Sequence, residues 1–383
     1  MEPLLFAPPA RGAKAYELRT PLTQAPPVFP SRGGVGSRGP PRRSPRRGGG
    51  RPSSPPPGPS LSAPILVTGG AGYIGSVLTR MLLKGNRPVR VLDRMLHGRH
   101  GLEDLAHDSN LSVLTHDLRD PRVHEEALEG VHTVVHLAAI VGDKACALDE
   151  ELAVQTNWSA TVAFARRAQA IGVHRFVFAS TCSVYGEGRE ETLTEESPVQ
   201  PLSLYAETRW HAEQGILELV NDPVFEPVIL RFGTVYGLSP RMRFDLAVNF
   251  LAQQAVREGA VRIFGGSQWR PFVHVSDIAR GIVMAIDEPL PRDVPPILNL
   301  GDNLENYQLR DLKEELEAHV PGVRVTIQPE KEDRRTYRVS FDRIEREWGF
   351  RARHRVGDGI EEVARAVRSG VIADPRERRY YNA

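Results

Sequence analysis

The sequence predicts an α/β fold built on a doubly wound parallel sheet. Short apolar segments alternate with segments whose apolar residues recur at helical spacing. The first apolar segment, 65–68, runs into a glycine-rich turn that opens a helical segment. Regular alternation of strand and helix requires right-handed crossovers, which put helices on both faces of a parallel sheet. Such a sheet binds ligands at the carboxyl ends of its strands.

The turn carries three glycines, Gly69, Gly72 and Gly75, in a pattern typical of a dinucleotide pyrophosphate site. We expect Gly69 to make the tight turn, Gly72 to let the backbone approach phosphate oxygens, and Gly75 to let the helix lie close to the strand. The helix begins with Tyr73 and Ile74, whose free N–H groups and positive dipole end face the anion. These features together predict a Rossmann-type domain.

The second predicted strand, 89–92, ends on Asp93, 18 residues after Gly75. A dinucleotide site needs a carboxylate at this place to accept hydrogen bonds from the adenosine ribose hydroxyls. Because that carboxylate would repel a 2′-phosphate, we expect NAD rather than NADP, although Arg94 stands beside it.

A third predicted strand, 111–114, leads into an acidic loop. We expect Asp117 to accept a hydrogen bond from the adenine amino group while Leu118 packs on the ring. Asp120 has a different use as a helix N-cap, since it precedes Pro121.

The fourth predicted strand, 131–139, ends on the small residues Ala138 and Ala139, which let the ribose and diphosphate of the cofactor lie close. We interpret His136 in this strand as a packed side chain rather than a catalytic one. A long helix, 149–169, should follow. The fifth strand, 175–181, then places hydroxyl groups at its carboxyl end.

A helix over about 205–220 begins with Tyr205, and Arg209 lies four residues on, so both point from the same helical face. Further on, the sequence predicts a smaller α/β part with helices at 244–256 and 278–286 and a strand at 261–264. The expected organisation is a disordered tail at 1–61, an NAD-binding domain at 62–235, and a mainly substrate-binding domain at 236–383 with some segments returning to the first sheet.

The tail differs in composition from the rest of the chain. Residues 1–60 hold 15 of the 31 prolines and a net charge of +8, so the remaining residues carry −7. The mildly acidic remainder argues against nucleic acid as a partner. An arginine-rich patch at 41–48 is either a binding or targeting segment or a solvated extension. The absence of a secretory signal and of any apolar run of membrane-spanning length, together with only two cysteines, favours the cytoplasm.

Six motifs, in this order, resemble an extended short-chain dehydrogenase/reductase of the nucleotide-sugar epimerase/dehydratase family. They lie at 68–75, 136–139, 180–186, 205–213, 230–237 and 270–277. The resemblance runs from about residue 65 to the C-terminus and leaves out only the tail.

The resemblance implies that Tyr205 is the acid/base on a sugar hydroxyl while hydride passes to or from the nicotinamide. A phenol with a pKa near ~10 is a poor base, and a nearby cation favours the phenolate. Thr181 should hydrogen-bond the same oxygen. Relatives carry lysine where this chain has Arg209, whose planar guanidinium cannot relay a proton. Arg209 therefore substitutes with adjusted geometry, marks a catalytically weak protein, or is only a surface residue of the helix.

The same resemblance completes the expected binding sites. The residues expected to contact NAD are Tyr205, Arg209, Leu137, Ala138 and Ala139. The residues expected to contact the substrate are Thr181, Thr234 and Arg270. Arg270 matches an arginine that binds the nucleotide diphosphate, although a surface salt bridge is the other use for it. Thr234 stands where relatives often have asparagine. No metal site is expected.

The residues after Thr181 bear on the reaction. Related dehydratases carry an Asp-Glu pair there and related decarboxylases a glutamate, but this chain has Cys182 and Ser183. We therefore expect an NAD-dependent epimerase or related oxidoreductase, in a homodimer. Cys182 is either a proton donor to carbon or a half-buried loop residue. The alternatives are a nucleotide-sugar dehydratase or reductase, and a catalytically weak NAD-binding regulatory protein.

Overall fold

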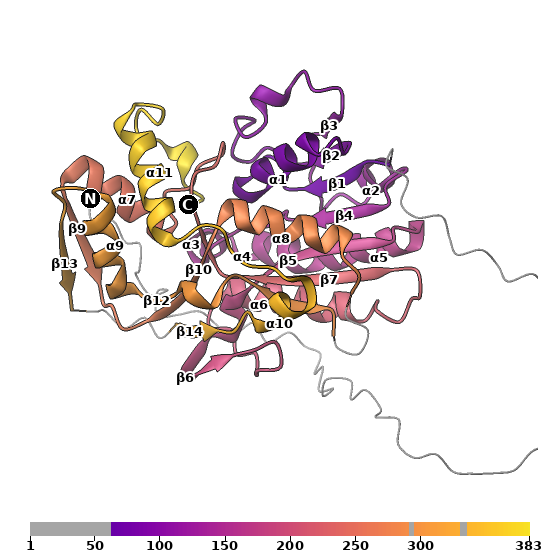
Figure 1. The fold of residues 1–383 in the computed structure, drawn as a ribbon. Helices are drawn as coiled ribbons and strands as arrows, with labels where there is room; N and C mark the ends of the chain where they lie inside the picture. The colour runs from indigo at the N-terminus through magenta and orange to yellow at the C-terminus, as the bar shows by residue number, and fades with distance from the viewer. Residues whose placement is uncertain (1–62, 291–294, 330–334) are drawn as a thin grey trace, which may run out of the picture. The chain divides into compact units, whose positions relative to one another are not determined.

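The computed structural model describes residues 63–290, 295–329 and 335–383 (Figure 1). The predicted disordered tail and its arginine-rich patch lie outside these residues. In the described part, no helix is both long enough and apolar enough to cross a membrane. The described residues belong to one compact unit, so the domain boundary at 235 stays a prediction.

Seven strands form the central sheet, in the order β11-β7-β5-β4-β1-β2-β3 (Figure 1). Their bounds are β1 Ile65–Thr68, β2 Val89–Leu92, β3 Leu111–Leu114, β4 Thr133–His136, β5 Arg175–Thr181, β7 Glu226–Phe232 and β11 Ile297–Leu300. Every neighbouring pair in this sheet is parallel. The strand order reverses between β1 and β4, which is the switch point where ligands bind in doubly wound sheets. The predicted fold class is confirmed.

Helices cover both faces of the central sheet (Figure 1). Val67 and Val135 belong to an apolar core with helices α1 and α8, whereas their neighbours Leu66 and Val134 belong to a core with α2, α5 and α6. The bounds of these helices are α1 Tyr73–Lys84, α2 Val123–Leu128, α5 Thr161–Ile171, α6 Leu204–Leu217 and α8 Val275–Asp287. Because both faces are buried, the inner strands are largely apolar rather than alternating, whereas the edge strand β3 is partly exposed.

A second apolar core lies in the later part of the chain and includes Phe244, Leu251, Ile263 and Ile360. The further elements are β6 Glu187–Leu193, β8 Thr234–Tyr236, α7 Ala247–Glu258, β9 Ala260–Phe264, β10 Trp269–His274, β12 Asn306–Gln308, α9 Leu312–His319, β13 Arg324–Gln328, β14 Thr336–Val339, α10 Asp342–Trp348 and α11 Val356–Arg368. Among these, α10 and β14 pack in the core that contains α1 and α8 rather than in the second core. The helix expected at 278–286 is α8, which packs on the central sheet rather than in this second core.

The helix expected over 149–169 is interrupted. After α4 (Glu150–Val154), residues Gln155–Ala160 form a π-helical turn before α5 begins. The side chain of Asn157 accepts from the N–H of Ile140 at 2.7 Å and donates to the carbonyl of the same residue at 2.9 Å. A π-turn accommodates one residue more than an α-helical turn, and here it turns Asn157 toward the backbone beyond β4. Apolar spacing alone could not reveal that extra residue.

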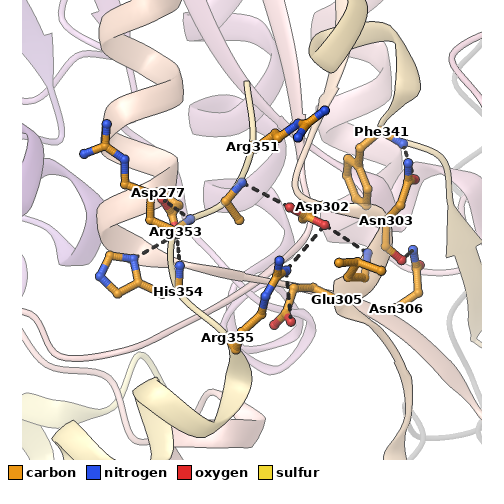
Figure 2. Close-up of polar contacts among 12 residues, drawn as sticks. Asp277, Asp302, Asn303, Glu305, Asn306, Phe341, Arg351, Arg353, His354 and Arg355 are labelled. Atoms are coloured by element: carbon orange, nitrogen blue, oxygen red, sulfur yellow. Dashed lines mark hydrogen bonds and ion pairs between the residues drawn. The ribbon is translucent and has the colours of Figure 1, made fainter. Parts of the chain in front are cut away.

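Carboxylates fix the segment that leads into α11 (Figure 2). Asp277, in the first turn of α8, accepts from the backbone N–H groups of Arg353 and His354, both at 3.0 Å. Glu305 accepts from the N–H of Val356 at 3.0 Å. We call Asp277, Glu305 and residues 353–356 the polar joint. It connects a helix on the central sheet with a helix of the second core.

Glu305 is expected to make the stability of the fold depend on pH. Burial raises the pKa of its carboxyl group from 4.5 to about 7, and Arg355, 3.5 Å away, opposes the shift only in part. The folded protein then binds a proton more tightly than the unfolded chain. This contribution is therefore complete below pH 4.5 and is lost as the pH rises through about 7.

Glu305→Gln should accordingly be more stable than the wild type at alkaline pH, by up to about 3 kcal/mol, and nearly equal to it in acid. Urea unfolding of both proteins across this range measures the difference in free energy. A difference that stays constant with pH would contradict the prediction.

Candidate active site

The glycine turn after β1 leaves no room for side chains at Gly69 and Gly75. Gly69 has a φ of +72°, and a Cβ on it would lie 2.8 Å from the backbone nitrogen of Ala138. A Cβ on Gly75 would lie 2.7 Å from the Cα of Gly70. Glycine at these places lets β1, the β4 exit and α1 approach one another closely.

Gly72 differs, because the space in front of it is open. A Cβ there would have one described neighbour within 4 Å, the carbonyl oxygen of Gly69 at 3.1 Å. Gly72 is the N-cap of α1, and no side chain caps this helix. The first N–H groups of α1 therefore point into an open cradle that suits an anion. This geometry fits the diphosphate of a dinucleotide.

The side chain of Tyr73 faces away from that cradle. It is buried, and its hydroxyl donates to the carbonyl of Gly237 at 2.6 Å and accepts from the side-chain amide of Asn249 at 3.1 Å. Burial raises the pKa of this phenol well above its ordinary value. Tyr73 thus anchors α1 to the segment after β8, and only its backbone N–H remains for a cofactor. The side chain of Ile74 is half-buried.

Asp93 lies at the end of β2 and holds the glycine turn. Its carboxylate accepts from the N–H of Ala71 at 3.0 Å and from the N–H of Met95 at 2.8 Å. Burial raises the pKa of this carboxyl group, and the two backbone hydrogen bonds oppose that shift. Each carboxylate oxygen keeps a second lone pair, so the group can still accept from ribose hydroxyls.

The predicted adenine residues have partners within the protein. Asp117 accepts from Arg119 Nη2 at 2.8 Å and lies 3.5 Å from Arg94, and Arg119 lowers the pKa of its carboxyl group. Leu118 is buried, and its carbonyl lies 2.8 Å from Nε2 of His124. Contact of Asp117 and Leu118 with adenine stays a prediction.

The exit of β4 lies against the glycine turn. The N–H of Leu137 donates to the carbonyl of Thr68 at 3.1 Å, and the N–H of Ala138 donates to the Thr68 hydroxyl at 3.2 Å. Ala139 follows and is half-buried. His136 is fully buried between two threonine hydroxyls, and burial lowers its pKa to about 3. These contacts favour a packing role for His136.

Tyr205 and Arg209 lie in the first turns of α6, which Ser203 caps by accepting from the N–H of Ala206 at 3.3 Å. Arg209 is only 1% exposed. Its guanidinium lies 4.3 Å from the ring centre of Phe178 and donates through Nη2 to the carbonyl of Ala179. Its Nε and Nη1 have no hydrogen-bond partner among the described residues. Arg209 is therefore not a surface residue, and its free donors fit ribose hydroxyls of a cofactor.

Two opposing effects act on Tyr205. Burial raises the pKa of its phenol, whereas the charges of Arg209 and Arg243 lower it. In the free protein the pKa of Tyr205 is therefore above its ordinary value, and the two cations limit the rise. An acid/base role depends on those cations.

Thr181 ends β5, and the described partners of its hydroxyl lie on Ser183. It accepts from the N–H of Ser183 at 3.1 Å and lies 2.9 Å from the Ser183 hydroxyl. Cys182 is buried with its thiol donating to the carbonyl of Arg231 at 3.3 Å, and burial raises its pKa. A structural role for Cys182 fits this position better than proton donation to a substrate.

The predicted substrate residues lie on neighbouring strands. Thr234 in β8 pairs with Phe272 in β10 and is half-buried. Arg270, also in β10, is buried, donates to the carbonyl of Trp269 at 2.8 Å and lies 5.1 Å from the ring centre of Tyr337. Arg270 is therefore not a surface side chain.

A buried polar network holds α6 on the sheet. Glu213 of α6 accepts from Ser180 of β5 and forms an ion pair with Arg231 of β7, 2.6 Å from Nη2. Arg231 also donates to the hydroxyl of Tyr185 at 3.0 Å, and that hydroxyl donates to Asn299 of β11 at 2.8 Å. The network fixes the helix that carries Tyr205 and Arg209 against three strands.

We expect Glu213→Gln to lower the free energy of unfolding by about 2 kcal/mol, because Arg231 would lose its buried counter-charge. Chemical unfolding measures this loss. Glu218→Gln, at an exposed ion pair at the end of the same helix, is the control and should change stability by less than about 1 kcal/mol. Equal effects of the two substitutions would argue against the network.

One group of described side chains has the spacing of metal ligands. Ligand atoms of His274, Asp277 and His354 lie within 4.8 Å of one another. Within the polar joint, Asp277 already accepts from the N–H groups of Arg353 and His354, and Nε2 of His274 lies 2.7 Å from Glu362. These contacts use the atoms that a metal would need.

Two features near the site were not predicted from the sequence. One is the π-turn with Asn157, and the other is a pair of buried arginines, Arg241 and Arg243. The only signal for the arginines was two positive charges separated by one residue in a segment otherwise rich in apolar residues.

The fold and the site define an NAD-dependent enzyme of the extended short-chain dehydrogenase/reductase class. The model of the NAD dependent epimerase/dehydratase family matches residues 65–301, and the chain belongs to this family. The predicted family, enzyme class and cofactor are thereby confirmed.

The chain is similar to proteins with different reactions. A Bacillus subtilis protein described as an uncharacterized UDP-glucose epimerase is 33% identical over 253 residues, which are 59% of this chain and 73% of that protein. UDP-glucuronic acid decarboxylase 1 of Danio rerio is 27% identical over 277 residues, 70% of this chain and 64% of the relative. The chain thus spans slightly less than two thirds of that second relative.

Among solved structures, the dTDP-glucose 4,6-dehydratase DesIV from Streptomyces venezuelae, with NAD and TYD bound, superposes with a TM-score of 0.70. It is 27% identical, and the match covers 80% of this chain and 97% of that one. The solved structure shares the fold and has NAD bound, and the three similar proteins differ in the reactions that their names give.

Proposed function

We propose that this chain is an NAD-dependent epimerase, or a related oxidoreductase, that acts on a nucleotide-linked sugar. The observation that carries the proposal is the pair on α6: a half-buried tyrosine with a buried cation whose Nε and Nη1 are unpartnered among the described residues. Bound NAD supplies the hydride acceptor. Tyr205 takes the proton from the sugar hydroxyl, and Arg209 stabilises the phenolate and donates to ribose hydroxyls.

The reaction type rests on the residues directly after β5. Thr181 is succeeded by Cys182 and Ser183, so no carboxylate stands directly beyond it to assist elimination of water. This favours epimerisation with NAD returned to its starting state over dehydration. Because a decarboxylase and a dehydratase are among the similar proteins, decarboxylation and dehydration are the alternative reactions. A third candidate, a catalytically weak NAD-binding protein, is motivated by Arg209 in place of lysine.

Incubation of the purified chain with UDP- and dTDP-linked sugars, analysed by mass spectrometry and NMR, tests the proposal. An epimerase gives a product of unchanged mass and altered ring stereochemistry. Loss of water or of carbon dioxide would assign one of the alternative reactions. No conversion of any sugar, with NAD bound, would favour the non-catalytic candidate.

We expect NAD to bind at least about 10-fold more tightly than NADP, because a 2′-phosphate would meet the carboxylate of Asp93. Two backbone hydrogen bonds fix this carboxylate, so it cannot easily move aside. Separate titrations with the two nucleotides measure the ratio. Tighter binding of NADP would assign the dominant role to Arg94.

The proposal includes a homodimer in the cytoplasm. Cys146 and Cys182, which are free and buried, suit a reducing compartment. Light scattering of the full chain tests the dimer, and a monomer at micromolar concentration would refute it.

A further inference from the structure

Arg241 and Arg243, which follow β8, are buried cations whose charges the protein balances only in part. They are 4% and 8% exposed. Arg243 donates through Nε to Asp245 at 3.0 Å. Arg241 donates through Nη2 to the neutral side chain of Asn382 at 2.7 Å, and its Nε has no hydrogen-bond partner among the described residues. Burial and the charge of Arg243 lower the pKa of Arg241 to about 10. Keeping this guanidinium charged inside the protein therefore costs free energy.

Arg241 lies next to the glycine turn. A Cβ on Gly101 would be 3.2 Å from the carbonyl carbon of Ala71, within the turn, and 3.3 Å from the Cβ of Arg241. Gly101 thus lies in contact range of both the turn and Arg241. Asp93, proposed for the adenosine ribose, is also close enough to act on the charge of Arg241.

Arg243 lies toward the other end of the site. A Cβ on Gly142, beyond the β4 exit, would be 3.9 Å from Nη2 of Arg243. The charge of Arg243 acts on Tyr205. Asn382, the partner of Arg241, donates to the carbonyl of Val141 at 3.1 Å and so joins the arginine segment to the β4 exit.

We propose that Arg241 and Arg243 form a second clamp on the diphosphate of NAD, opposite the helix start at Gly72. In a dinucleotide the diphosphate lies between the two riboses. The charge of Arg241 is influenced by Asp93 and the charge of Arg243 acts on Tyr205, and these are the residues proposed for the two ends. Phosphate oxygens would supply the missing negative charge and accept from the free Nε edge of Arg241. The inference rests on the cofactor of the proposed function. A nucleotide sugar also carries a diphosphate, but the position of Arg241 beside Gly101 and the glycine turn, and the influence of Asp93 on its charge, favour the dinucleotide.

Calorimetric titration of the full chain and of Arg241→Met tests the clamp with four ligands: NAD, ADP-ribose, adenosine and UDP. Methionine keeps an unbranched side chain without the charge. We expect the affinity for NAD and for ADP-ribose to fall about 10–100-fold, because charge-assisted hydrogen bonds to a diphosphate are lost. The affinity for adenosine and for UDP should change less than about 3-fold. A selective loss of UDP affinity would assign the clamp to the substrate and overturn the proposal.

Arg175→Met is the matched control. Arg175 is 6% exposed and also has an unpartnered Nε, but it lies at the amino end of β5, away from the strand ends that bind ligands. It should lower stability and leave the ratio of NAD to adenosine affinity unchanged. If Arg241→Met does not fold, Arg241→Lys is used to test the clamp. Lysine is a point donor without the Nε edge, so this variant should lower the affinity for NAD about 3-fold relative to the affinity for adenosine.

The clamp is overturned if Arg241→Met leaves the ratio of NAD to adenosine affinity unchanged, or if Arg241→Lys does so where only that variant folds. Either result leaves the proposed function unaffected. A wild-type chain that binds NAD but converts no sugar overturns the proposed function alone. A wild-type chain that binds no NAD overturns both.

Discussion

Replacing Tyr205 with phenylalanine is expected to lower turnover about 10²–10⁴-fold while the affinity for NAD changes only a few-fold. The substitution removes the hydroxyl that moves the proton. It keeps the ring, which packs beside Ile140, Cys146 and Ala153. The turnover rate is measured with the nucleotide sugar that the wild type converts, and the affinity for NAD is measured in a separate titration.

Tyr307→Phe is the control for loss of a phenol hydroxyl. That hydroxyl contacts Glu315 at 3.3 Å in the second core, far along the chain from α6. Its removal should leave turnover within about 3-fold. If Tyr205→Phe turned over at the wild-type rate, Tyr205 would not be the acid/base.

Removing the charge of Arg209 is expected to shift the pH profile of turnover to higher pH and to weaken NAD binding about 10–100-fold. Burial raises the pKa of Tyr205, and Arg209 is the largest of the opposing charges. Without the cation the pKa rises further, so the limb of the profile that requires the phenolate moves to higher pH. Arg209→Lys keeps the charge and should preserve or raise turnover, because an ammonium is a compact donor.

Two neutral variants separate charge from packing at this position. Arg209→Ala removes the charge and leaves a cavity beneath Phe178, whereas Arg209→Met removes the charge and fills much of the space. Rate–pH profiles of both should shift alike, and only the alanine variant should lose additional stability. A profile that Arg209→Met does not move would show that the guanidinium acts through packing.

The parts of the fold that were predicted most accurately are those whose residue types suit only one structural role. Apolar runs buried on both faces of the sheet and glycines that exclude a Cβ gave the strands and the turn at Gly69 and Gly75. The sequence could not predict the direction of Tyr73, because a side chain at a helix start can face the anion site or the core. The choice depends on Gly237 and Asn249, which lie more than 160 positions away in sequence.

Charged residues were harder to assign. Asp117 was expected at adenine, yet its described partners are Arg119 and Arg94. Arg270 and Arg209 both proved to be buried, which residue type alone does not reveal. Arg241 and Arg243 attract attention only when their burial is known, because an arginine in sequence is ordinarily solvated.

The π-turn at Gln155–Ala160 keeps two helices in phase with two different surroundings. Ala153 before the turn packs with Cys146, and Phe164 after it packs against the central sheet. A π-turn takes up one residue more than an α-helical turn and leaves the facing direction of the helix beyond it unchanged. Deleting a single residue within the turn would therefore convert this stretch to regular α-helix and leave Phe164 in its core. What the deletion would remove is the bulge that turns Asn157 toward the backbone of Ile140, so the extra residue serves this contact rather than the helix as a whole.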